Sequence, residues 1–201
     1  MSIFRNSSLV LVFLIVTGNV VGAYGQAPME AVRDNIEKAL TILNDPRYEG
    51  AEQAGAQREK LWGVLKEIFN FREFSRRVLA GHWKKFTPIQ REEFTDVFGK
   101  FLGKFYLSRL QKYYTDERAV YLEQQFSTVK KATVKIGVIW KNQEIPVEIR
   151  MIERHGHWKA YDLLAFGISA VRNYRAQFDE ILRKATPDQV IAQLEERIKN
   201  L

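Results

Sequence analysis

The sequence predicts a single α+β domain, in which α-helices pack on one face of a twisted antiparallel sheet of about four strands. Two observations lead to this prediction. Apolar residues recur at intervals of three and four before residue 115 and after Gly167, as on one face of a helix. Between residues 118 and 163 they alternate instead, as on one face of a strand. No internal repeat or low-complexity linker divides the chain.

Composition excludes several classes of protein. The 201 residues contain no cysteine and three histidines, so disulfide scaffolds, thiol catalysis, iron–sulfur clusters and cysteine-type zinc sites are excluded. The chain is 46% hydrophobic and 12% aromatic, which is typical of a folded domain with a substantial core. The 31 basic residues exceed the 24 acidic ones by seven, which favours an anionic partner without specifying its kind.

Residues 1–25 are expected to be a secretory signal, which leaves residues 26–201 as the folded domain. Arg5 precedes an unbroken apolar run over residues 9–16, and the small residues Ala23 and Gly25 fit a cleavage site before Gln26. The run is shorter than the about 20 residues of a transmembrane helix. The alternative is an uncleaved N-terminal anchor. Export argues against nucleic acid as the anionic partner, and export without cysteine fits a bacterial cell envelope.

Several helix starts carry capping signals. Thr87-Pro88 followed by Gln90 combines a capping threonine, a proline at the first helical position and a glutamine that closes a capping box. The same pattern recurs from Thr186, and Asn70 with Glu73 predicts another capping box. The segments expected to be helical are 29–43, 56–69, 71–79, 88–114, 168–182 and 187–198.

The long helix over residues 88–114 carries a broad aromatic face. Gly99 and Gly103 lie mostly off this face, and we expect them to permit close packing on the other side. The expected strands are 121–130, 133–140, 145–151 and 158–163, and they form a meander with one apolar face. An apolar cavity between sheet and helix is one interpretation of these two faces, and solid packing is the other.

Candidate catalytic and metal-binding residues are few. His155 and His157 lack further ligands at recognisable spacing, so they favour a polar turn over a metal site. The segment from Gly167 to Ser169 resembles a nucleophile elbow superficially, because no histidine follows it. Asp162 near a strand end could be the general base of a small-molecule enzyme, or it could cap the turn at Gly167 or pair with an arginine.

Three arginines could contact an anionic head group at the mouth of a pocket. Arg109 falls within the aromatic face of the long helix, where a charge must be paired or must reach solvent. Arg172 and Arg175 flank Tyr174 on a later helix and allow the same two interpretations.

Blocks distributed over residues 71–178 resemble one protein family. They are Phe71-Arg-Glu-Phe-Ser-Arg-Arg-Val-Leu-Ala-Gly-His-Trp83, Thr87-Pro-Ile-Gln-Arg91, Tyr106 with Leu110 and Tyr113, Trp158-Lys-Ala-Tyr-Asp162, Gly167-Ile-Ser169 and Asn173-Tyr-Arg-Ala-Gln-Phe178. In order and spacing they are similar to the MlaC-type toluene-tolerance family, over essentially all of residues 26–201. Ala80 and Phe166 depart from the family pattern without changing the apolar periodicity.

The resemblance implies a periplasmic phospholipid carrier with no catalytic residue, metal or cofactor. Its cargo would be phospholipid, held by its acyl chains in a deep apolar pocket. Its partners would be an outer-membrane lipoprotein and porin complex and an inner-membrane ABC transporter with a substrate-binding-domain subunit, and it would act as a monomer to maintain outer-membrane lipid asymmetry. The residues expected to line the pocket are Phe98, Phe101, Leu102, Phe105, Val134, Ile136, Val138, Val147, Ile149, Met151, Val171 and Tyr174.

Overall fold

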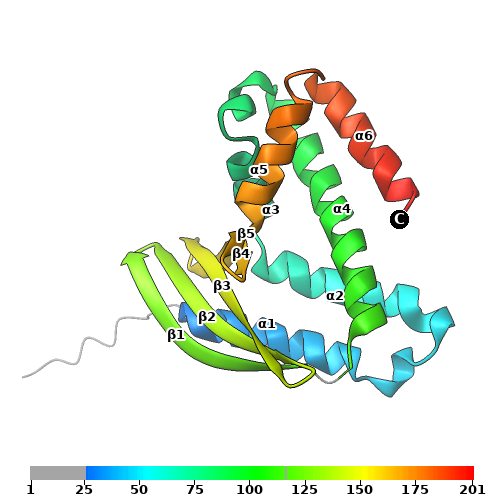
Figure 1. The fold of residues 1–201 in the computed structure, drawn as a ribbon, viewed down its shortest axis with the longest axis vertical. Coiled ribbons are helices and arrows are strands. Elements are labelled where there is room, and N and C mark those ends of the chain that lie inside the picture. The colour runs from blue at the N-terminus through cyan, green and yellow to red at the C-terminus, as the bar shows by residue number, and fades with distance from the viewer. Residues whose placement is uncertain (1–25, 116) are drawn as a thin grey trace, which may run out of the picture.

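The computed structural model describes residues 26–115 and 117–201, and the expected secretory signal lies outside them. The helices and strands follow the predicted order (Figure 1). No helix within the described ranges is both long enough and apolar enough to span a membrane. The elements are α1 (Pro28–Leu43), α2 (Ala54–Ile68), α3 (Phe71–Leu79), a 3-10 segment (Ala80–Lys85), α4 (Pro88–Tyr113), β1 (Arg118–Thr128), β2 (Lys131–Trp140), β3 (Gln143–Arg154), β4 (His157–Ala165), β5 (Ile168–Ser169), α5 (Ala170–Ile181) and α6 (Pro187–Lys199).

The sheet is an antiparallel meander in the order β1-β2-β3-β4-β5. The predicted α+β class and the four long strands are confirmed, and β5 is an addition. This strand has two residues, which pair as Leu164 with Ser169 and Ala165 with Ile168. A strand this short carries no alternation, so periodicity could not reveal it.

All four hairpins of the sheet have two-residue turns. In the three that join β2 to β3, β3 to β4 and β4 to β5 both turn residues have positive φ, which matches the right-handed twist of the paired strands. Glycine takes the second position of two turns, after His155 and Phe166, whereas the third consists of Lys141 and Asn142. Phe166 has φ 50°, a conformation that aromatic residues rarely adopt.

The predicted helix caps are confirmed at Thr87 and Thr186. Thr87 Oγ1 accepts from the Gln90 amide at 3.2 Å, and the Gln90 side chain accepts from the Thr87 amide at 3.0 Å. Of the capping box predicted at Asn70, only the hydrogen bond from the Glu73 amide to the Asn70 side chain is present. Asn70 Oδ1 accepts from the Glu73 amide at 2.9 Å, but the Glu73 carboxylate binds arginines instead of reaching back.

The apolar residues form two separate cores. In the sheet core, Val134 and Met151 are fully buried against Ala31 and Val32 of α1. In the helical core, aromatic rings from α3, α4 and α5 pack together with apolar residues of α6. Its central rings are Phe74, Phe94, Phe98 and Phe178.

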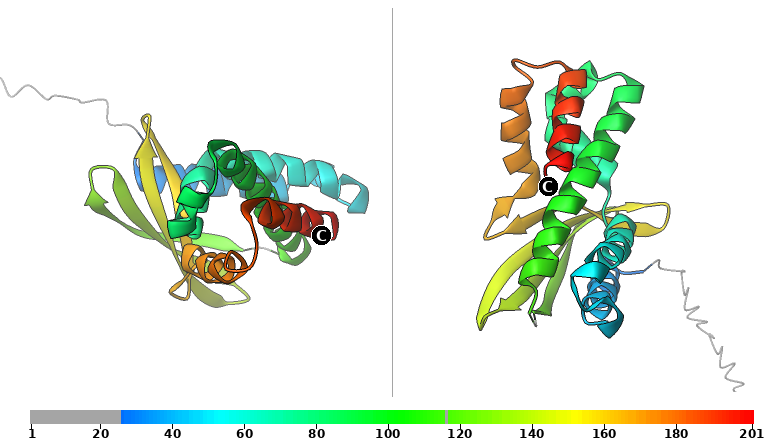
Figure 2. Two further views of the ribbon diagram at one scale, coloured as in Figure 1. Left: turned by 90° about the horizontal axis from the view of Figure 1, so that it is seen from above. Right: turned by 90° about the vertical axis from the view of Figure 1, so that its right-hand side faces the viewer.

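Phe69 and Asn70 join the two cores between α2 and α3. The Phe69 side chain packs against both. The Asn70 amide donates to the carbonyl of Ala160 at 2.7 Å, and Phe69 forms an isolated parallel bridge with the same strand residue. The sheet and α1 lie on one side of the molecule and α3, α5 and α6 on the other, while α4 extends alongside both (Figures 1 and 2).

The long helix α4 approaches α2 and α3 through two glycines, as predicted. A Cβ atom on Gly99 would lie 3.3 Å from the Phe71 ring, and one on Gly103 would lie 2.6 Å from the Trp62 ring. Neither position leaves free space for a methyl group, and the contact at Gly103 is with a large planar ring.

We predict that Gly103→Ala destabilises the fold by about 1–2 kcal/mol, because overpacking against Trp62 exceeds the gain in helix propensity. Gly63→Ala is the matched control, since a Cβ on this α2 glycine meets nothing within 4 Å. The control is expected to stabilise the fold by about 0.5–1 kcal/mol. Denaturant unfolding measures both changes, and equal effects of the two substitutions would contradict the close approach.

Candidate functional site

The face of the sheet that packs against α1 is called the inner face here. Helix α1 covers one half of it and leaves the other half uncovered. Val134 and Met151 are fully buried under α1. Further along the same face Val138 and Val147 are half-buried, and Leu163 at the β4 side is 40% exposed. An apolar surface therefore continues beyond the area that α1 covers.

A bulge in β4 determines which side chains reach this face. Arg150 pairs with Asp162 whereas Met151 pairs with Ala160, so Tyr161 is an extra residue. The bulge places Leu163 on the inner face and Asp162 on the outer face with Arg150. The alternation of apolar residues did not reveal it, so Leu163 was missed as a candidate.

The aromatic face of α4 changes from buried to exposed along the helix. Phe98 is fully buried in the helical core, whereas Phe105 is half-buried and Tyr106 is 49% exposed. Phe101 lies between them, with stacked ring contacts to Phe98 and Phe105. The C-terminal half of α4 thus presents uncovered aromatic residues, and the concave side of the sheet turns toward it and α1 (Figures 1 and 2).

Tyr174 of α5 lies where the helical core meets this aromatic stretch. Its ring packs edge-on against the Phe98 ring, with 5.2 Å between the ring centroids, and its hydroxyl lies 3.1 Å from the hydroxyl of Tyr106. Burial raises the pKa of Tyr174, and the hydrogen bond with Tyr106 raises it further. Tyr174 is therefore neutral, and its hydrogen bond with Tyr106 links α4 to α5 at the edge of an apolar surface.

The remaining residues expected to line a pocket lie deeper. Leu102 and Val171 are buried in the helical core. Ile136 and Ile149 are buried in the sheet core, beside the half-buried residues of the inner face.

The three candidate arginines have different surroundings. The Arg109 guanidinium lies 3.5 Å over the Phe105 ring and is exposed beside the uncovered aromatic residues. Arg172 donates to the carbonyl of Gly167 at 3.2 Å, and Arg175 donates twice to the carbonyl of Arg77 at 3.0 and 2.8 Å. All three bind backbone, since Arg109 also donates to the carbonyl of Phe105 at 3.3 Å, but only Arg109 adjoins the uncovered aromatic residues of α4.

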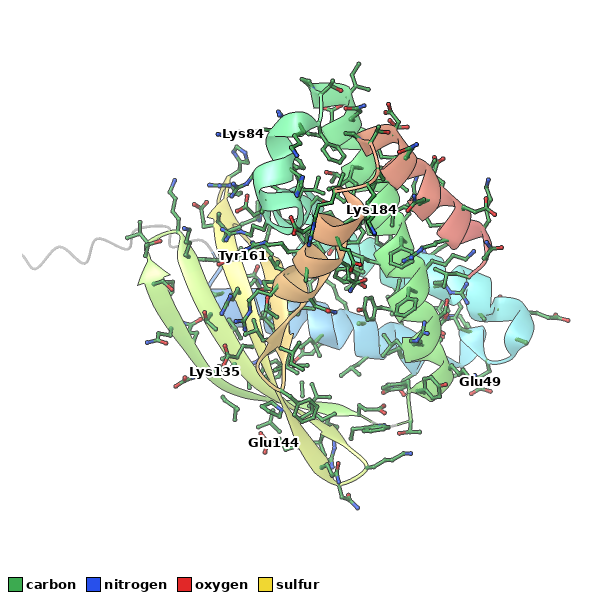
Figure 3. All side chains as sticks on the ribbon, turned by 45° about the horizontal axis from the view of Figure 1, so that its top comes forward. Glu49, Lys84, Lys135, Glu144, Tyr161 and Lys184 are labelled. Atoms are coloured by element: carbon green, nitrogen blue, oxygen red, sulfur yellow. The ribbon has the colours of Figure 1, made fainter. Side chains whose placement is uncertain are left out.

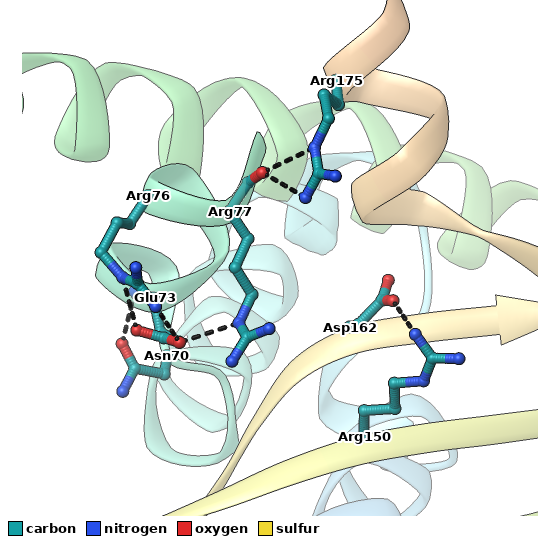
Figure 4. A network of polar contacts seen from close by, with 7 residues as sticks. All are labelled: Asn70, Glu73, Arg76, Arg77, Arg150, Asp162 and Arg175. Carbon is teal, nitrogen blue, oxygen red and sulfur yellow. Dashed lines mark hydrogen bonds and ion pairs between the residues drawn. The ribbon is translucent and has the colours of Figure 1, made fainter. Parts of the chain in front are cut away.

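Asp162 is fully buried and has a partner for each oxygen. Its Oδ1 accepts from the Val171 amide at 3.0 Å, and its Oδ2 accepts from Ser169 Oγ at 2.7 Å. Its Oδ2 also accepts from Arg150 at 3.3 Å, a contact drawn in Figure 4. The arginine-pairing interpretation is therefore confirmed. The carboxylate connects β3, β4 and the start of α5, and Asp162 lies on the outer face of the sheet.

A second buried carboxylate, Glu73, organises α3. Burial opposes its charge, yet hydrogen bonds and the charges of Arg76 and Arg77 hold the pKa of Glu73 below its ordinary value. Figure 4 shows Glu73 with its two arginines, and Figure 3 labels Tyr161 on the sheet. The Arg77 guanidinium also lies 3.9 Å over the ring of Tyr161. This network connects α3 to β4 and has a structural role.

The other residues considered for catalysis or metal binding do not form a reactive site. Ser169 Oγ accepts from the Arg172 amide and caps α5, so it is not a nucleophile at an elbow. His155 and His157 are exposed, and within residues 26–115 and 117–201 no three side chains form a group that could hold a metal ion.

Cavities occur among the helices. Two surface cavities of about 400 and 280 Å³ flank Trp62 between α2 and α4, and a small one of about 20 Å³ lies beside Phe98, Phe101 and Tyr174. None of these three is lined by sheet residues. The deep pocket expected between sheet and helices therefore stays a prediction, supported by the uncovered apolar side chains on both.

Uncovered apolar side chains on a sheet and on a nearby helix are typical of a domain that binds an apolar ligand. A family model described as MlaC protein matches residues 33–196, and the chain belongs to the MlaC family. This membership argues against the enzyme alternative, and Asp162, its candidate general base, is held by Val171, Ser169 and Arg150.

Two known proteins illustrate the relationship. The chain is 23% identical over 124 residues to the intermembrane phospholipid transport system binding protein MlaC of Haemophilus influenzae, an alignment that covers 60% of this chain and 58% of that protein. Its fold is similar to that of a phospholipid-binding protein from Ralstonia solanacearum, solved in complex with a phospholipid. The TM-score is 0.74 at 19% identity, with 87% of this chain and 98% of that chain covered.

We predict that Asp162→Ala lowers the free energy of unfolding by about 3 kcal/mol, because it leaves Arg150 and the Val171 amide without their acceptor. The control is Asp96→Ala, which removes an exposed pair with Lys100 and is expected to cost less than about 0.5 kcal/mol. Urea unfolding followed by circular dichroism compares them. A stability of Asp162→Ala equal to that of the control would contradict the structural role.

Proposed function

We propose that the chain is a periplasmic phospholipid carrier, exported by residues 1–25 and folded over residues 26–201. It encloses acyl chains and moves lipid between an outer-membrane lipoprotein and porin complex and an inner-membrane ABC transporter with a substrate-binding-domain subunit. This traffic maintains the lipid asymmetry of the outer membrane. The observation that carries the proposal is the uncovered apolar half of the inner sheet face, turned toward the aromatic C-terminal half of α4. The relative from Haemophilus influenzae and the family support it.

The physical need for a carrier follows from the cost of exposing acyl chains. Each CH₂ group removed from water contributes about 0.8 kcal/mol, so releasing a two-tailed lipid into water costs on the order of 20 kcal/mol. A carrier must therefore hold the tails against apolar side chains and hand them over by docking. The excess of basic residues would favour docking to acidic faces and anionic lipid surfaces.

Burial divides the proposed lining into two groups. Val138, Val147, Phe105 and Tyr174 are half-buried and could contact tails directly. The residues packed in the two cores would form the back wall or contact tails after small side-chain movements; they are Phe98, Phe101, Leu102, Val134, Ile136, Ile149, Met151 and Val171.

Among the arginines, Arg109 is the best placed to contact a phosphate. Its guanidinium is exposed and stacked on Phe105, beside the Tyr106 and Tyr174 hydroxyls, which offer further hydrogen bonds. Arg172 and Arg175 hold the backbone carbonyls of Gly167 and Arg77 and line a different cavity beside Leu79, so they would act on a head group by longer-range attraction.

The direct test is organic extraction of the protein purified from a bacterial periplasm, followed by lipid mass spectrometry. We expect stoichiometric phospholipid. Protein that carries no phospholipid, and takes up none when incubated with donor vesicles, would contradict the carrier function and favour a structural role in the envelope.

We predict that Val147→Arg preserves the fold but strongly reduces co-purified phospholipid, because the substitution places a charge on the uncovered inner face. The matched control is Val120→Arg, a valine of β1 that pairs with Gly137 and lies on the outer face. Lipid content per protein, measured by phosphorus assay, is expected to remain unchanged in the control. Equal lipid in both variants would remove the inner face from the binding site.

A further inference from the structure

The turn between β4 and β5 presents large apolar side chains to solvent. Phe166 is 68% exposed and Ile168 is 69% exposed. The two-residue turn consists of Phe166 and Gly167, and the Phe166 amide donates to the carbonyl of Pro146 in β3 at 3.3 Å. The turn is thus held by the sheet while its side chains project outward.

Phe166 is an unfavourable choice for its position if the turn serves folding alone. Its φ of 50° is left-handed, a conformation in which asparagine or glycine is preferred at the first position of such hairpin turns. A phenylalanine here costs backbone strain and exposes an apolar ring to water. Because the Phe166 side chain is 68% exposed, packing within the protein recovers little of either cost, which directs attention to a binding role.

The surroundings of the turn combine apolar and basic groups. Arg172 donates to the carbonyl of Gly167, so its guanidinium lies beside the turn, and the exposed Arg175 follows one helical turn later on α5. Glu148 pairs with Leu164 and therefore lies on the outer face, opposite the face that Ala165 and Ile168 share. The side of the turn that carries Ile168 is thus apolar with cations nearby.

The size of this surface favours a membrane over a protein partner. Two projecting side chains bury far less than the about 800 Å² per partner of a stable protein interface. Insertion of a small apolar tip among lipid head groups, together with basic residues that attract anionic lipids, is an established mode of peripheral membrane binding.

We propose that the Phe166–Ile168 turn is a membrane-contacting tip, which inserts into the head-group region of a bilayer containing anionic phospholipid. Arg172 and Arg175 attract the anionic head groups. Because Ile168 and Ala165 share the inner face with Val147, contact at the tip would set the rim of the proposed acyl-chain site against the bilayer. This last consequence rests on the proposed carrier function, whereas the membrane contact itself does not.

The test is co-flotation of the protein with vesicles of phosphatidylcholine, with and without phosphatidylglycerol. We expect binding to the anionic vesicles that weakens with added salt. Phe166→Asn is expected to lower the partition coefficient about tenfold, because it removes the apolar ring. Its folding should be preserved, because asparagine tolerates the left-handed conformation. Phe166→Leu keeps an apolar side chain and is expected to retain most of the binding.

The matched control is Val129→Asn, because Val129 is an exposed apolar residue in the turn between β1 and β2, at the opposite end of the sheet. This control is expected to bind vesicles as the unchanged protein does. An unchanged partition coefficient for Phe166→Asn, or an equal loss in Val129→Asn, overturns the proposal.

Lipid content separates this proposal from the carrier function. Phe166→Asn is expected to retain its co-purified phospholipid. Protein that carries phospholipid but does not bind anionic vesicles overturns the membrane tip, leaves the carrier function intact and assigns the turn to a protein partner. Protein that binds vesicles through Phe166 but carries no phospholipid supports the tip and contradicts the carrier function.

Discussion

The joint at Phe69 and Asn70 determines how the rest of the molecule is arranged. Phe69 packs against the sheet core and the helical core at once, and the Asn70 amide is bonded to Ala160 of β4. Since α2 ends and α3 begins here, the helical body is fixed at one edge of the sheet. The sheet and the far half of α4 therefore do not have to pack against each other, and both keep uncovered apolar side chains.

Buried carboxylates strengthen the same joint. Asp162 holds the start of α5 to β4, and Glu73 holds two arginines of α3, one of which lies over Tyr161 of β4. Each charge is compensated by arginine and by hydrogen bonds, as burial requires. The polar groups that sequence inspection marks as chemical candidates are thus used to connect elements, and the proposed binding surface is built from apolar side chains.

Local sequence signals made the helices and strands predictable, but they did not make the strand registers predictable. The capping patterns at Thr87 and Thr186 and the alternation in β2 and β3 are local, so the helices and long strands follow from them. The bulge at Tyr161, the short β5 and the choice of arginine partners for Glu73 depend on neighbours distant in sequence. For the same reason Asp162 could not be placed on one face or the other.

The sequence alone determined the α+β class, the order of its elements, the apolar faces of sheet and long helix, and the resemblance to the MlaC family. Each follows from periodicity, caps or residue blocks that are read along the chain. The tertiary structure decided which parts of those apolar faces are covered, because coverage depends on where α1 lies on the sheet and how α4 is held against α2 and α3. Periodicity gives the direction of a side chain, whereas the element that packs against it is set by contacts between distant segments.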